Sequence, residues 1–322
     1  MNIQRWIGRR ESNWKRLDTL LRQVEKKGLK SLNGLEIQEL ASLYRSVSAD
    51  LARAKTNQVG KILIQDLQRL TSRSYNLIYQ GSRHQEWQAV REFIRFGFPG
   101  IVQQTWVYTA IATAVFLLGI LIAWWYSWQD PVFMALIVPE NIISMVRDDH
   151  ELWMGSIVGT EPLASSNIMI NNILVSFKAV SGGVTAGIFT LYILLFNGLL
   201  IGAIATLVGQ NNLAYPFWAF VFPHGSLELP AIFLAGGAGL LIGRAILFPG
   251  KYNRIDALKY YGFQAAQLVF GIVPLLVIAG IIEGFFSPSP LIPDSLKYLA
   301  GISLFILLIK YLMQQPEESR YN

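Results

Sequence analysis

The fold is decided by residues 171–209, which read NNILVSFKAVSGGVTAGIFTLYILLFNGLLIGAIATLVG. Lys178 is the only charged residue in this run. The run has about twice the roughly 20 residues that an apolar helix needs to cross a bilayer. The pair Gly182-Gly183 offers the natural break, so we expect two spans, 168–181 and 185–208. A stretch of this kind excludes an ordinary soluble enzyme and indicates an integral membrane protein.

Further apolar runs lie on both sides of this stretch, and together with it they predict about six spans. The other four spans are residues 106–125, 229–248, 264–282 and 295–312. Residues 216–223, PFWAFVFP, are apolar but too short to cross, so we predict a re-entrant segment there. The predicted fold class is therefore all-α: a polytopic transmembrane helix bundle of about six spans plus a re-entrant segment.

The charged residues separate a soluble part from the membrane part. Residues 1–97 hold 18 of the 27 Lys and Arg residues and 9 of the 21 acids, a net charge of +9, whereas the rest of the chain carries −3. Apolar residues recur there with helical spacing in four stripes, within 14–24, 40–51, 59–79 and 87–94. We therefore expect three regions, which are a basic helical domain over 1–98, a transmembrane domain over 99–313 and a tail over 314–322.

Loop charges set the expected orientation, because cytoplasmic loops are enriched in Lys and Arg. The loop 249–263 carries three cations against Asp256, whereas the segment 129–167 carries six acids and a single cation, Arg147. We expect this acidic segment to lie outside as short surface helices, and both chain termini to lie in the cytoplasm. The location is then the cytoplasmic membrane or an internal bacterial membrane. About a hundred polar residues precede the first apolar block, so no signal peptide is expected.

The basic domain raises the question of which polyanion it faces. Its cations are spread along every predicted helix, and no recognised nucleic-acid motif is present. A basic segment beside a membrane is typical of attraction to anionic lipids. We therefore expect membrane lipids and no nucleic acid among the partners.

Polar side chains inside hydrocarbon indicate function by default, and here they form a cluster of Asn171, Asn197, His224 and Glu228. His224 and Glu228 are four residues apart, so on a helix they share one face. One interpretation is a structural pair that fixes the re-entrant turn. The alternative is a metal site, but zinc takes three or four protein ligands and this region offers one histidine and one carboxylate. We therefore predict no catalytic residue, no metal site and no cofactor.

Glycine is the other signal of the membrane part. Several glycines are four residues apart, a spacing that lets helices approach closely. The predicted helix-packing glycines are Gly182, Gly183, Gly187, Gly198, Gly202, Gly239 and Gly243. Tight packing inside one bundle is the simpler interpretation, with a homodimer contact or a substrate groove as the alternatives. Asn197 would then form a hydrogen bond across such a contact.

In combination these elements resemble the stage II sporulation protein M family of bacterial and archaeal membrane proteins. The resemblance covers roughly residues 35–312 and rests on Asn171, Gly182-Gly183, Asn197-Gly198 and above all Pro223-His224-Gly225 with Glu228. It implies a membrane location. The sporulation member implies a role in engulfment beside partners that cut the cell wall, although most relatives occur in bacteria that never sporulate.

Three functional hypotheses follow. The leading one is a non-enzymatic membrane protein that assembles with or localises other envelope proteins in cell-wall processes. The alternative is a transporter or channel-like subunit that uses the broken helices around Asn197, His224 and Glu228. The third is an intramembrane metal-dependent hydrolase, which would require about one zinc ion per chain.

Overall fold

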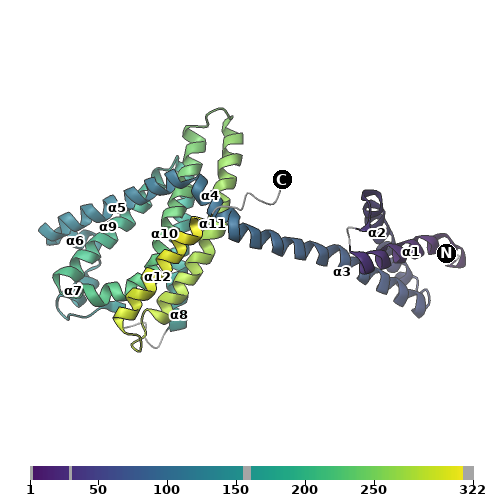
Figure 1. The fold of residues 1–322 in the computed structure, drawn as a ribbon, viewed down its shortest axis with the longest axis horizontal. Helices are drawn as coiled ribbons and strands as arrows, with labels where there is room; N and C mark the ends of the chain where they lie inside the picture. The colour runs from purple at the N-terminus through teal and green to yellow at the C-terminus, as the bar shows by residue number, and fades with distance from the viewer. Residues whose placement is uncertain (1–2, 29–30, 155–160, 315–322) are drawn as a thin grey trace. The chain divides into compact units, whose positions relative to one another are not determined.

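The computed structural model describes residues 3–28, 31–154 and 161–314. The described residues form helices joined by short connections and contain no strand, which confirms the predicted all-α class. The chain divides into two compact units, residues 1–92 and residues 93–322 (Figure 1). Each unit has its own hydrophobic core.

The first unit consists of α1 (Ile3–Lys27), α2 (Gly34–Thr56) and α3 (Lys61–Glu92). Their apolar stripes meet in one core, which contains Trp14, Leu17, Leu21, Leu40, Val47 and Leu67. Helix α1 ends at Lys26-Lys27, and Gly28 follows with a left-handed φ of +78°. The third and fourth predicted stripes, 59–79 and 87–94, lie largely on one helix, because α3 continues to Glu92. One glycine inside a helix costs only about 1 kcal/mol, so Gly81 does not end α3.

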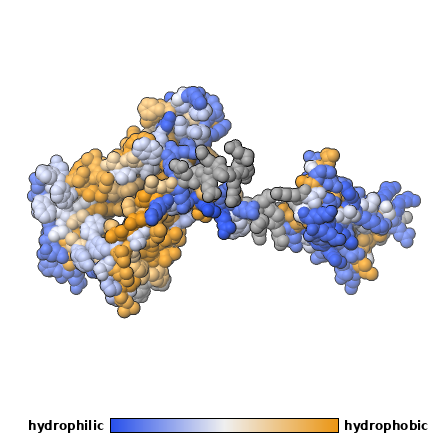
Figure 2. Space-filling model, viewed as in Figure 1, coloured by the Kyte–Doolittle hydropathy of each residue, from blue (hydrophilic) through white to orange (hydrophobic). Residues whose placement is uncertain are grey.

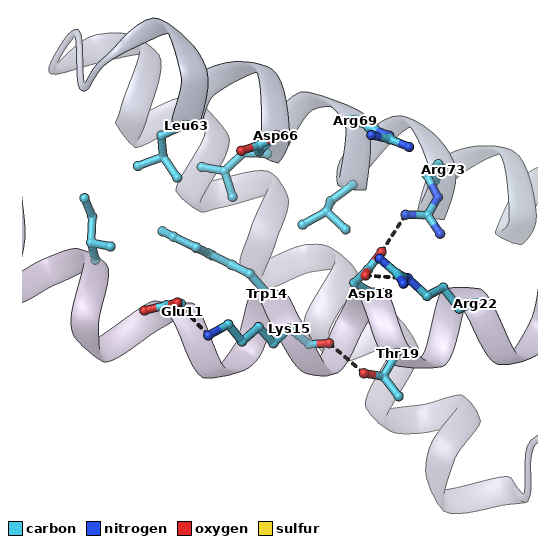
Figure 3. Close-up of a pocket in the computed structure, with 13 residues that line it drawn as sticks. Glu11, Trp14, Lys15, Asp18, Thr19, Arg22, Leu63, Asp66, Arg69 and Arg73 are labelled. Carbon is cyan, nitrogen blue, oxygen red and sulfur yellow. Dashed lines mark hydrogen bonds and ion pairs between the residues drawn. The ribbon is translucent and has the colours of Figure 1, made fainter.

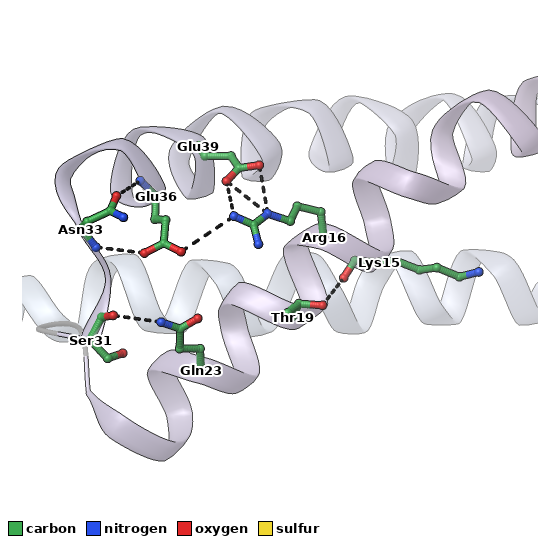
Figure 4. A network of polar contacts seen from close by, with 8 residues as sticks. All are labelled: Lys15, Arg16, Thr19, Gln23, Ser31, Asn33, Glu36 and Glu39. Atoms are coloured by element: carbon green, nitrogen blue, oxygen red, sulfur yellow. Dashed lines mark hydrogen bonds and ion pairs between the residues drawn. The ribbon is translucent and has the colours of Figure 1, made fainter.

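Polar contacts fix how α1 and α2 meet (Figure 4). The backbone N–H of Glu36 donates to Asn33 Oδ1 at 2.9 Å, and the backbone N–H of Asn33 donates to Glu36 Oε2 at 3.0 Å. This reciprocal capping box satisfies two backbone donors at the start of α2. Arg16 of α1 donates to Glu39 of α2 at 2.7 Å. The start of α2 is therefore capped, and one exposed ion pair joins α2 to α1.

The second unit is a larger helical bundle. In chain order its elements are the π-helical η2 (Phe93–Gly97), α4 (Phe98–Gln104), α5 (Trp106–Gln129), α6 (Pro131–Ile137), α7 (Glu140–Arg147), α8 (Glu161–Ser181), the 3-10 helix η4 (Gly182–Thr185), α9 (Ile188–Gln210), α10 (Ala214–Leu247), α11 (Arg254–Ile281), the π-helical η5 (Ile282–Phe286) and α12 (Asp294–Leu312). The central helix is α10, which packs against α5, α8, α9, α11 and α12. Apolar residues of the outer helices stay exposed, and the orange surface of this unit in Figure 2 shows them. A surface of this kind suits lipid.

Five described helices are long and apolar enough to cross a membrane: α5, α9, α10, α11 continued by η5, and α12. The predicted second span corresponds to α8, which has sufficient length but carries several Ser and Asn residues and Lys178. The predicted break at Gly182-Gly183 is confirmed, since α8 ends at Ser181 and α9 begins at Ile188. Ala186 and Gly187 both have positive φ there, at 56° and 86°.

The predicted re-entrant segment is wrong, because residues 214–247 form one continuous helix, α10. Pro216 lies in the first turn, where a backbone N–H would have no partner inside the helix. Pro223 and Pro230 lie in the interior, where Pro is tolerated in membrane helices if neighbouring groups satisfy the freed carbonyls. Ser226 Oγ donates to the carbonyl of Pro223 at 2.9 Å, a local side-chain bond within the same stretch of α10. The three prolines therefore leave α10 intact.

The acidic segment after α5 contains two short helices, as predicted. Asp130 caps α6 by accepting a hydrogen bond from the backbone N–H of Val132. The buried side chains Met134 of α6 and Ile143 of α7 join a core cluster with residues of α9 and α10. Residues 155–160 of the predicted segment lie outside the described residues, and 161–167 belong to α8. The short helices therefore cover one end of the bundle.

Candidate intramembrane site

Two helices bring a histidine and two carboxylates together inside the membrane unit. On α10, His224 and Glu228 are one turn apart and face the same way. The end of α11 continues into the π-helical η5, which carries Glu283 and is followed by Ser287. His224 Nε2 lies 3.7 Å from Glu283 Oε1, and His224 Nδ1 lies 3.1 Å from Ser287 Oγ. Short π-helical turns inside α-helices are frequent at functional sites.

His224, Glu228 and Glu283 line a cavity of about 170 Å³. Its other walls are apolar and include four aromatic side chains: Trp153, Met154, Ile201, Ile204, Phe217, Trp218, Phe220, Val221 and Leu229, with Gly225. Phe220 meets the imidazole of His224 edge to face, with 5.4 Å between ring centroids. The described lining contains no Lys or Arg. The cavity is thus apolar except for one polar corner, which consists of His224, Glu228 and Glu283.

The polar corner is buried and incompletely satisfied. His224 is only 5% exposed. Glu283 Oε2 is buried and has no hydrogen-bond partner among the described residues. Likewise, no described group donates to the carboxylate of Glu228. Buried charged groups normally have partners, because their desolvation is costly. Two carboxyl groups without a cationic side chain in the described lining would therefore be stabilised by a proton or by a cation.

The structure separates the four residues that the sequence grouped together. His224 and Glu228 lie at the cavity, but the contacts of His224 go to Glu283 and Ser287. Asn197 donates to the Ile193 carbonyl of its own helix at 2.7 Å, so the predicted hydrogen bond across a helix contact is not the one observed. Asn171 is exposed and contacts its neighbour Asn172.

Sequence reasoning missed Glu283, which lies 55 positions after Glu228. A signal was present, since Glu283 is the only acid between Asp256 and Asp294 and lies in an otherwise uncharged run. An isolated carboxylate of this kind in a membrane segment is a functional candidate by default. The pairing itself could not be predicted, because it depends on how α10 and α11 pack.

The predicted packing glycines lie at close helix contacts inside the chain. A Cβ atom at Gly198 would overlap the carbonyl oxygen of Phe116, and one at Gly202 would overlap that of Ile120, both on α5. Gly183 and Gly239 meet backbone-to-backbone, Gly239 also meets Ala179, and Gly243 meets Ala186 and Gly187. Gly182 packs against the backbone of Thr190. The glycines therefore allow α5 to approach α9, and η4 to approach α10.

Comparison with known proteins places both units in described groups. Residues 112–288, which include His224, Glu228, Glu283 and Ser287, match the family described as Stage II sporulation protein M. Residues 4–80 match a family described as a domain of unknown function (DUF8413). No solved structure matches the chain.

Two similar proteins come from Methanocaldococcus jannaschii. The uncharacterized protein MJ0706 is 28% identical over 101 residues, which is 30% of this chain and 45% of that protein. The uncharacterized protein MJ0793 is 29% identical over 127 residues, which is 38% of this chain and 70% of that protein. The chain thus spans less than half of the first relative. The family match covers more than half of this chain, from α5 to the residue after Ser287, and the protein therefore belongs to the stage II sporulation protein M family.

Proposed function

We propose that this protein is a non-enzymatic membrane subunit that assembles with another envelope protein through its first unit. The observation that carries the proposal is an open groove of about 830 Å³ between α1 and α3 (Figure 3). Its floor is apolar, with Trp14, Leu63, Leu67 and Leu70. Its rims carry the charged residues Glu11, Lys15, Asp18, Arg22, Asp66, Arg69 and Arg73. The family match covers residues 112–288, outside this groove, and supports the membrane location of the protein.

The occupant that fits this groove is an amphipathic helix of a partner protein. Only α1 and α3 line the groove, and a third helix can lay an apolar stripe between two others while its polar flanks reach the rims. Several rim charges already pair with one another, such as Lys15 with Glu11 and Arg73 with Asp18. Asp66 and Arg69, on one face of α3, are therefore the rim charges that we assign to recognition of the partner.

The test compares two charge reversals on α3 in the full-length protein. Asp66→Arg/Arg69→Glu changes the rim, whereas Arg91→Glu/Glu92→Arg changes exposed residues outside the groove and leaves net charge unchanged. We expect one envelope protein to co-purify with wild type and with the control, and at least tenfold less of it with the rim variant. A helical peptide from that protein should also bind wild type and the control at least tenfold more tightly than it binds the rim variant. Equal recovery from both variants would refute the groove as the docking site.

A second candidate function is transport, because the cavity holds two carboxylates without a cationic side chain in its described lining. Buried ionisable groups of this kind mark ion pathways in membrane proteins. Proteoliposomes that contain the full-length protein would then conduct protons or a cation, and Glu228→Gln would abolish the flux. Flux at the level of empty liposomes would remove this candidate.

For the membrane arrangement we propose six crossings, with α8 as the sixth and both chain termini in the cytoplasm. The support is the charge of the loop 248–253 and its flanks, with Lys251, Arg254 and Lys259, which favours the inside. The chain has no cysteine, so single cysteines report accessibility without background. We expect Lys251→Cys to be protected from an impermeant thiol reagent in whole cells and Leu291→Cys to be labelled. The opposite pattern would refute this arrangement, since it requires either that α8 does not cross or that both termini lie outside.

We do not extend the proposal to a homodimer, although the glycine spacing alone allows one. The predicted packing glycines are already in contact within the chain, as at Gly198 against α5 and Gly243 against Gly187. A dimer contact would need a different surface.

A further inference from the structure

We propose that His224, Glu228 and Glu283 bind one divalent transition-metal ion, for which zinc is the prototype. Each residue offers one ligand atom, and the three atoms lie within 4.8 Å of one another. They come from two packed helices, so the packing of α10 against α11 and η5 assembles the site. This assignment goes beyond the assembly role and does not depend on it.

The distances suit a metal with small side-chain adjustments. Ligand atoms about 2.1 Å from a tetrahedral zinc ion lie roughly 3.4 Å from one another. The 3.7 Å between His224 Nε2 and Glu283 Oε1 is already close to this separation. The third ligand is Glu228, whose carboxylate oxygen lies within 4.8 Å of the other two ligand atoms. A rotation about the side-chain bonds of Glu228 would bring this oxygen to the required separation.

The surroundings of His224 also suit a ligand. When Nδ1 carries the proton, it donates to Ser287 Oγ, and the lone pair of Nε2 faces Glu283 and the cavity. Metal-binding histidines almost always donate their other ring N–H to an outer partner, which fixes the tautomer and the ring orientation. Ser287, fully buried, is that partner here. Its role is positioning.

Charge gives an independent argument. A divalent cation would neutralise two carboxylates, where the described lining supplies no Lys or Arg. It would also give Glu283 Oε2, buried and without a described partner, a positive charge close by. Imidazole with carboxylate is a donor set that suits zinc and similar transition metals, whereas calcium and magnesium prefer oxygen ligands alone. Three protein ligands leave one position open toward the cavity, as in catalytic zinc sites.

The experiment measures zinc in the full-length protein purified in detergent without chelator. We expect about one zinc per chain in wild type and in the control Glu140→Gln, which removes an exposed acid elsewhere in the same unit. The content should fall at least tenfold in His224→Ala and in Glu283→Gln. Ser287→Ala should keep the stoichiometry at saturating zinc but bind about 10- to 100-fold more weakly, as outer-partner substitutions do.

Because misfolding of a variant would also remove zinc, the wild-type protein supplies a second readout. After treatment with a chelator, addition of zinc should raise the thermal midpoint of wild type and of Glu140→Gln, with saturation at about one equivalent. The midpoint of folded Glu283→Gln should not respond. Two results would overturn the proposal. One is folded wild type that holds no zinc and shows no shift, which would leave the carboxylates to bind protons only. The other is a wild-type zinc content in both ligand variants.

Discussion

Each unit of this protein places a carboxylate among its packed helices, and the two have opposite surroundings. Asp50 in the first unit is 1% exposed and accepts hydrogen bonds from Arg10 Nε at 2.9 and 3.0 Å and from Trp14 Nε1 at 3.0 Å. Glu283 in the second unit has one contact to an imidazole nitrogen at 3.7 Å and one oxygen without a described partner. Protein groups donate hydrogen bonds to the first carboxylate, whereas the second has an oxygen to which no described group donates.

The difference teaches how to distinguish a stabilising charge from a functional one. A satisfied buried ion pair holds its helices in place, and removing one partner leaves the other uncompensated. A carboxylate that the protein does not satisfy destabilises the fold until a ligand or a proton arrives. Exposure alone does not explain the difference, since Glu283 is also largely enclosed, with 12% of its side chain exposed. The two cases differ in the hydrogen-bond partners of each carboxylate oxygen.

The largest effect should follow from removal of the satisfied carboxylate. Asp50→Ala leaves the buried indole N–H of Trp14 without its acceptor and Arg10 without its counter-ion. We expect a loss of about 3 kcal/mol in the first unit, below the upper end for buried pairs because Arg10 is 30% exposed. Hydrogen exchange of the α1–α3 amides in the full-length protein should then accelerate roughly a hundredfold.

The matched control is Glu39→Ala, which removes an exposed carboxylate that also pairs with an arginine, Arg16. Exposed pairs contribute little, so exchange in the control should stay close to wild type. If Asp50→Ala and Glu39→Ala behave alike, the contrast between a satisfied buried charge and a surface charge does not hold in this unit.

The next effect concerns how the second unit holds its helices together. The first unit packs through side chains such as Leu17 and Leu67, whereas α5 and α9 approach through glycine. Gly198→Ala would place a methyl group against the carbonyl of Phe116, which cannot move without shifting α5. We expect a loss of about 1–3 kcal/mol, the range for overpacked cores, seen as a lower thermal midpoint in detergent.

Gly209→Ala is the control for this substitution, because Gly209 is on the same helix and nothing lies within 4 Å of an added Cβ. Alanine favours a helix over glycine by roughly 1 kcal/mol, so the control should keep or raise the midpoint. Equal midpoints for the two variants would mean that α5 and α9 do not need the close approach.

The unsatisfied carboxylate predicts a smaller change in the opposite direction from Asp50. In chelator-treated protein, Glu283→Gln replaces a poorly solvated acid with a neutral side chain of nearly the same shape. We expect the free energy of unfolding to equal that of wild type or to exceed it by at most about 1–2 kcal/mol, because the desolvation penalty is relieved. The thermal midpoint should accordingly stay the same or rise. A large drop in the midpoint would show that Glu283 stabilises the fold as Asp50 does.

Sequence patterns predicted the elements of this protein better than their contacts. Apolar length identified α5, α9, α11 and α12 because a bilayer imposes a minimum length. The same reasoning failed for α10, since Pro216 and Pro223 look like boundaries although one lies in the first turn and the other is tolerated among packed helices.

The candidate site could be predicted only in half. His224 and Glu228 are visible from local spacing, because a helix places residues four apart on one face. Glu283 joins them only through tertiary packing, which no local pattern in one sequence encodes. Asn171 and Asn197 were grouped with them on polarity alone, and their hydrogen bonds run to a neighbour and to their own helix.

The smallest predicted effect sharpens the comparison at the surface, where charges pair but water screens them. The Arg73 guanidinium donates to Glu25 at 2.9 Å and holds the pKa of Glu25 below its usual value. A carboxyl whose pKa is lower in the folded state stabilises the fold above its unfolded pKa, about 4.3, and that contribution is lost as the pH falls through the folded pKa. Because Glu25 is about half exposed, the contribution should be at most about 0.5–1 kcal/mol.

Arg73→Gln should therefore weaken the hydrogen-exchange protection of the α1 and α3 amides at pH 7. Below about pH 4.5 this protection should decline less in the variant than in wild type, after correction for intrinsic exchange rates. Arg69→Gln, on the same helix and outside this ion pair, is the control and should keep the wild-type profile. In 1 M salt the difference between the two variants should shrink, because screening weakens an exposed pair far more than a buried one such as Asp50 with Arg10. A pH profile of Arg73→Gln identical to wild type would place the acid sensitivity of this unit elsewhere.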